Sequence, residues 1–114
     1  MSNLQFVTKI DLCSLDDGSK PMEVRKLFDG EDATLIEIKL RDRHTLTRHK
    51  AVESITVLCL AGKGMFRAGS HLNEEHELVA GTLISVAAGI EHEVEAQPDV
   101  TILVTKFKRI EVEK

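Results

Sequence analysis

Hydrophobic and polar positions alternate along much of the chain with a period of two residues. In ATLIEIKL (33–40), the polar residues Glu37 and Lys39 stand between apolar neighbours. In EHEVEA (91–96) the alternation is strict, and His92 shares one face with apolar residues. Successive side chains of a β-strand point to opposite faces, so this period predicts half-buried strands in both segments.

Further segments predict strands because they are rich in apolar or β-branched residues and are bounded by turn residues. They are ESITVLCLAG (53–62), KGMFRAG (63–69), HELVAG (76–81), TLISVAAG (82–89) and VTILVTKFKRI (100–110). We expect Gly62-Lys63-Gly64 to form a tight hairpin turn, and Pro98 to lie in a connection between strands. Turn signals recur about every ten residues, which is typical of an all-β sandwich or barrel, and no helix of any length is expected.

Length and composition indicate one folded unit. A chain of 114 residues fits a single domain, 1–114, and no repeat, linker or low-complexity tract divides it. Cys13 and Cys59 are far apart in sequence and are expected to be free thiols, with Cys59 in the core. No segment resembles a signal peptide or is long and apolar enough to span a membrane, so a cytoplasmic protein without membrane contact is expected.

The charge pattern argues against nucleic-acid binding. The formal net charge is −4, and the chain contains no Trp and no Tyr for base stacking. A loose basic cluster around Arg41 and Arg48 is interrupted by Asp42. We therefore expect no nucleic-acid partner.

The segment GTLISVAAGIEH (81–92) resembles the second motif of the cupin superfamily. That motif is Gly, five residues, Pro, any residue, Gly, two residues, His, and here Gly81, Gly89 and His92 are in register with it. Ala87 replaces the proline, and Thr82 replaces the usual Asp. The resemblance covers about residues 24–108 and implies a jelly-roll barrel, also called a double-stranded β-helix.

The first cupin motif is degenerate in this chain. With Gly62 at the motif glycine, His49 falls on the first histidine position without a gap. Ala51 then occupies the second histidine position and Ile55 the glutamate position, while Glu53 lies two residues away from the latter. Only His49 and His92 therefore match the family's metal ligands.

The resemblance implies a site for a divalent metal such as Fe, Mn, Ni or Zn, held in the family by three imidazoles and one carboxylate. Two imidazoles rarely hold such an ion tightly, because catalytic zinc normally takes three protein ligands. Candidate helpers are His44, Glu53 and His76, although no spacing indicates them. Both a rebuilt metal site and a metal-free site, with the imidazoles as structural or ligand-binding groups, stay open here.

Strand alternation, once the register is fixed by the family resemblance, predicts the residues that line the mouth of the barrel. They are His49, Ala51, Ile55, Val57, His92 and Val94. We expect a cupin-fold protein that binds a small molecule in this pocket. Alternatives are a metal-dependent dioxygenase or isomerase using His49 and His92, and a structural or interaction module with a filled barrel, so whether the chain is an enzyme stays open. Apolar residues on both faces of ITVLCL (55–60) suggest a buried outer face and a homodimer.

Overall fold

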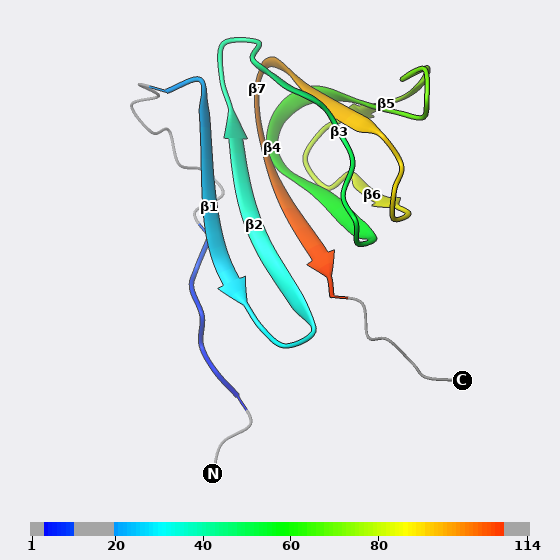
Figure 1. Ribbon diagram of the computed structural model, residues 1–114. Coiled ribbons are helices and arrows are strands. Elements are labelled where there is room, and N and C mark those ends of the chain that lie inside the picture. Colours follow the sequence, from blue (N-terminus) through cyan, green and yellow to red (C-terminus); the bar gives the residue numbers. More distant parts are fainter. Residues whose placement is uncertain (1–3, 11–19, 109–114) are drawn as a thin grey trace, which may run out of the picture.

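A computed structural model of the chain describes residues 4–10 and 20–108 (Figure 1). The described residues form seven β-strands and no helix. They therefore contain no helix that could cross a membrane. The strands are β1 (Met22–Asp29), β2 (Ala33–Leu40), β3 (Thr45–His49), β4 (Ile55–Ala68), β5 (Glu74–Leu78), β6 (Leu83–Val86) and β7 (His92–Phe107). The all-β prediction is confirmed, and β2 has the bounds that alternation predicted.

The sheet is antiparallel, with the strand order β1-β2-β7-β4-β5. In addition, β3 pairs with β7, and β6 pairs with β4. Figure 1 shows β1 and β2 beside the C-terminal part of β7, while β3, β5 and β6 curl around the other end of the molecule. The two long strands β4 and β7 run through both parts and pair along most of their length. They therefore hold the two parts of the barrel together.

Two sequence predictions are wrong at the centre of these long strands. Segments 53–62 and 63–69 form the single strand β4, so Gly62-Lys63-Gly64 is not a hairpin turn. Segments 91–96 and 100–110 likewise meet in β7, which contains Pro98. The register of β4 against β7 shifts between Cys59 and Ala61 and between Gly62 and Gly64, and such bulges bend a strand without ending it.

Gly62 makes this bend possible. Its φ of 80° lies in the left-handed region, where a side chain is strained. A Cβ atom at this position would also collide with the backbone carbonyl of Asp99 on β7. The glycine that looked like a turn residue is thus required by the close approach of two paired strands.

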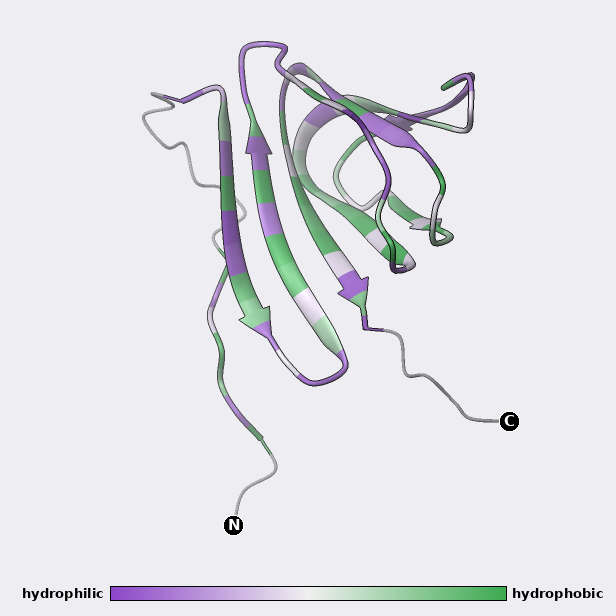
Figure 2. Ribbon diagram, viewed as in Figure 1, coloured by the Kyte–Doolittle hydropathy of each residue, from purple (hydrophilic) through white to green (hydrophobic). Residues whose placement is uncertain are grey.

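The residues of the hydrophobic core come from β2, β4, β5, β6 and β7. Alternating bands of hydrophobic and hydrophilic residues run along β1 and β2 in Figure 2, as expected for strands with one face inward. Cys59 is buried in this core as predicted, and burial raises the pKa of its thiol. Cys13 lies outside the described residues. The core consists of Ile38, Leu40, Ile55, Val57, Cys59, Phe66, Leu78, Val86, Val94, Ala96, Val100, Ile102 and Val104.

Candidate functional site

The two motif histidines lie next to each other. His49 at the end of β3 is the register partner of His92 at the start of β7. Their ring centroids are 4.3 Å apart and the ring planes are inclined by 63°. His49 is exposed, whereas His92 is only 3% exposed and also stacks on Phe66 of β4, with ring centroids 5.7 Å apart. The fold therefore joins residues 43 positions apart in one polar pair.

Both imidazoles are oriented by backbone carbonyls. Nδ1 of His49 lies 2.8 Å from the carbonyl oxygen of Thr47, and Nδ1 of His92 lies 2.9 Å from that of Ile90. A carbonyl oxygen only accepts, so in each ring Nδ1 carries the hydrogen and donates it. In the neutral rings Nε2 then carries a lone pair and is the nitrogen left to accept a hydrogen bond or to bind an ion.

His92 is held in its neutral form. Burial lowers the pKa of His92 because the imidazolium loses its hydration, and the neighbouring His49 lowers it further. The hydrogen bond to Ile90 acts in the opposite direction but is the weaker cause than burial. At neutral pH the ring of His92 is thus an uncharged hydrogen-bond acceptor.

A cavity of about 220 Å³ adjoins this pair. All six residues predicted for the barrel mouth line it: His49, Ala51, Ile55, Val57, His92 and Val94. Its walls are otherwise mostly apolar and come from β1, β2, β3 and β7: Val24, Ile36, Ile38, Leu46, Ile102 and Val104. Lys50 and Lys106 complete the lining. We call this space the histidine cavity.

The candidate helper ligands do not lie in the histidine cavity. His44 and Glu53 do not line it, and His76 lines a different cavity, where its Nε2 lies 3.2 Å from Oε2 of Glu74. Ile55, at the family's glutamate position, is buried and apolar. No group of three His, Cys, Asp or Glu side chains suited to a metal occurs among residues 4–10 and 20–108. The donor set that the structure describes is therefore a poor fit for the resident divalent ion of the family.

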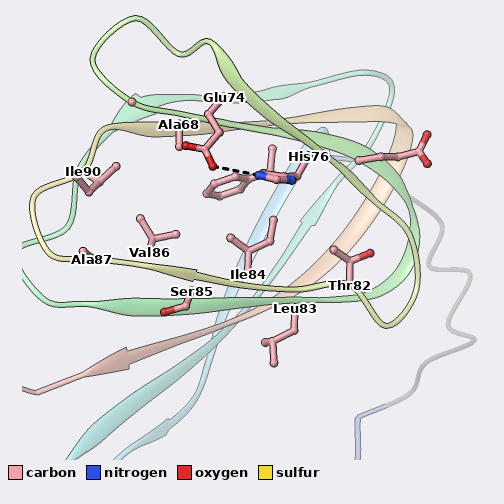
Figure 3. A pocket seen from close by; sticks show the side chains of 13 residues that line it. Ala68, Glu74, His76, Thr82, Leu83, Ile84, Ser85, Val86, Ala87 and Ile90 are labelled. Carbon is pink, nitrogen blue, oxygen red and sulfur yellow. Dashed lines mark hydrogen bonds and ion pairs between the residues drawn. The ribbon is translucent and has the colours of Figure 1, made fainter.

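A second, larger cavity of about 590 Å³ opens between β4, β5 and β6. Figure 3 shows Ile84, Val86 and Ile90 on one side of it and His76 with Glu74 on the other. Phe66 lines this second cavity while stacking on His92, which lines the histidine cavity. The ring pair thus stands between the two spaces.

Sequence reasoning missed Lys50, Lys106 and the second cavity. Lys106 could have been found, because strand alternation places it on the same face as Ile102 and Val104. Lys50 follows His49 directly, outside a strand, where alternation gives no direction. The second cavity depends on how β5 and β6 sit against β4, which no local pattern specifies.

Solved structures share this fold. A conserved protein of unknown function from Streptococcus pyogenes is 21% identical, with a TM-score of 0.73 over 96% of this chain and 95% of the other. A cupin superfamily protein from Desulfitobacterium hafniense is 12% identical, with a TM-score of 0.70 over 77% and 78% of the two chains. An RmlC-like cupin from Shewanella frigidimarina is 13% identical, with a TM-score of 0.71 over 80% and 79%. Comparison of the sequence with protein-family models and with curated proteins finds no match. The chain has the cupin fold, as its second motif predicted.

Proposed function

We propose that this cupin-fold protein binds a small molecule in the histidine cavity. The observation that carries the proposal is the lining itself: two oriented imidazoles at one side of a mainly apolar space. Small-molecule sites commonly combine an apolar wall with a few fixed polar groups, which supply affinity and orientation respectively. A barrel filled by side chains, as an interaction module would have, accounts less well for this space.

A screen by thermal unfolding tests the proposal. Small acids, sugars and other metabolite-sized compounds are added to the wild-type protein, since a ligand that binds only the folded state raises the Tm. Ala51→Leu adds volume inside the cavity and should abolish the shifts. Ala80→Leu makes the same change at an exposed residue that lines neither cavity.

The proposal is supported if compounds raise the Tm of the wild type and of Ala80→Leu but not that of Ala51→Leu. Shifts that Ala51→Leu retains in full, or no shift with any compound, would overturn it. Elemental analysis of the same untagged protein, purified without chelator, tests the metal-dependent alternative. Near-stoichiometric metal that both His49→Ala and His92→Ala lose would favour that alternative, which needs further ligands from outside the described donor set.

A further inference from the structure

The ionisable side chains of the histidine cavity are all basic. They are His49, Lys50, His92 and Lys106, and no Asp or Glu is among the lining residues. The chain as a whole has 19 acidic and 15 basic residues, so a lining without any carboxylate departs from its composition. The electrostatic environment of the cavity is therefore positive inside an acidic protein.

The two lysines have no carboxylate partner among the described residues. Some other cations are paired: Lys108 lies 2.7 Å from Asp29, and Arg67 contacts three glutamates. Between residues 4–10 and 20–108, no ion pair involves Lys50 or Lys106. A lysine ammonium has three hydrogens to donate and no acceptor, so these two side chains are open to an anionic ligand.

The rest of the lining limits the shape of that ligand. Branched apolar side chains from five strands cover most of the wall, including Ile36, Ile38 and Val57. They favour a short apolar body, because burying apolar surface is favourable and burying an unpaired polar group is costly. A volume of about 220 Å³ equals that of roughly seven water molecules. A ligand with a similar number of non-hydrogen atoms would fill it.

We infer that the histidine cavity takes a small organic carboxylate with a short apolar body, its charged end at Lys50 and Lys106. The inference rests on the proposed function and names the class of its ligand. The lysines rather than His92 hold the carboxylate, since Nε2 of the neutral His92 ring is an acceptor, as a carboxylate oxygen is. His92 instead faces the remainder of the ligand.

Three probes of equal chain length separate charge from shape: pentanoate, pentanamide and pentylamine. Their affinities are measured by NMR titration of the full chain, following the signals of cavity residues. The Lys50→Gln/Lys106→Gln double variant removes both charges, and Lys63→Gln removes one charge from an exposed residue of β4 that lines neither cavity.

The expected result is that pentanoate binds at least about threefold more tightly than pentanamide or pentylamine, as partly exposed charge pairs contribute. The double variant should weaken pentanoate binding by about threefold to tenfold and leave pentanamide binding unchanged. Lys63→Gln should alter neither. Raising the salt concentration should weaken pentanoate binding in the wild type and in Lys63→Gln, but not in the double variant.

Two outcomes overturn the inference and are distinguishable. If pentanamide or pentylamine shifts the same cavity signals with an affinity equal to that of pentanoate, small-molecule binding stands and the carboxylate class is wrong. If pentanoate does not bind, the carboxylate class is again wrong. The proposed function fails as well only when the thermal screen also yields no compound whose Tm shift is lost in Ala51→Leu.

Discussion

His49 and His92 are register partners across the ladder of β3 and β7, and their rings lie 4.3 Å apart while each Nδ1 donates to a carbonyl two residues earlier in the chain. The same local geometry thus occurs twice and leaves both Nε2 atoms available. The two rings differ in burial, because only His92 is enclosed by the barrel and stacked on Phe66. This difference allows their structural roles to be separated by mutation.

Truncating His92 should destabilise the protein far more than truncating His49. His92→Ala removes a buried ring from its stack on Phe66 and leaves the Ile90 carbonyl without its donor, at a cost of about 2–4 kcal/mol. His49→Ala affects an exposed ring and should cost less than about 1 kcal/mol. Urea unfolding of both variants measures the difference. Equal losses would mean that His92 is not packed as described.

The burial of His92 should make stability depend on pH. Its pKa in the folded state is lowered below the ordinary value of 6.5, so on acidification the unfolded state takes up this proton first. The stability that His92 contributes is complete above about pH 6.5, falls as the pH drops below that value, and stops falling below the folded-state pKa.

His92→Gln provides the comparison, because the glutamine side chain stays neutral throughout this pH range. The free energy of unfolding of the wild type is expected to fall more steeply than that of His92→Gln as the pH is lowered from 7.5 to 5.5. Parallel curves for the two proteins would show that His92 has the same pKa in both states.

Gly62 and Gly81 should respond differently to the same substitution. Both have positive φ, 80° and 95°, so an alanine is strained at either position by about 1 kcal/mol. Only at Gly62 would the new Cβ atom also collide with the backbone of β7, whereas nothing lies within 4 Å at Gly81. We expect Gly62→Ala to lower the free energy of unfolding by about 3 kcal/mol or more. Losses of similar size in both variants would argue against the bent-strand contact.

Arg67 should stabilise the outer surface of the sheet through three carboxylates. Its guanidinium contacts Glu75, Glu93 and Glu95 at 2.8, 3.0 and 2.8 Å. Arg67→Met leaves these like charges together, and we expect a loss of about 1–2 kcal/mol that diminishes at high salt. Lys26→Met, which breaks a single exposed pair with Asp29, should cost clearly less. A result for Arg67→Met no larger than this control would mean that the three pairs do not act together.

Local patterns predicted β2 well, but they missed β1 and β3 and failed at the centres of β4 and β7. Alternation fixed β2, because that strand has one face in the core throughout. The Gly62-Lys63-Gly64 stretch has the composition of a turn, yet β4 continues through it because β7 pairs on both sides of the bend. That pairing joins residues distant in sequence, which no short window contains.

The lining of the histidine cavity could be predicted only in part from the sequence. Its six predicted residues follow from strand alternation combined with the cupin resemblance, which supplied the register. The orientation of the imidazoles depends instead on backbone carbonyls, and the position of Lys50 on the path of the chain after β3. These are properties of the folded backbone rather than of residue order.

The most direct test of small-molecule binding is to locate a bound compound by methyl NMR. The tightest compound from the thermal screen is titrated into protein labelled at isoleucine, leucine and valine methyl groups. We predict saturable shifts at Ile36, Val57 and Val94, which line the histidine cavity, and loss of these shifts in Ala51→Leu. Shifts confined to Leu83, Ile84 and Ile90 of the second cavity, or no saturable shift at all, would contradict the account.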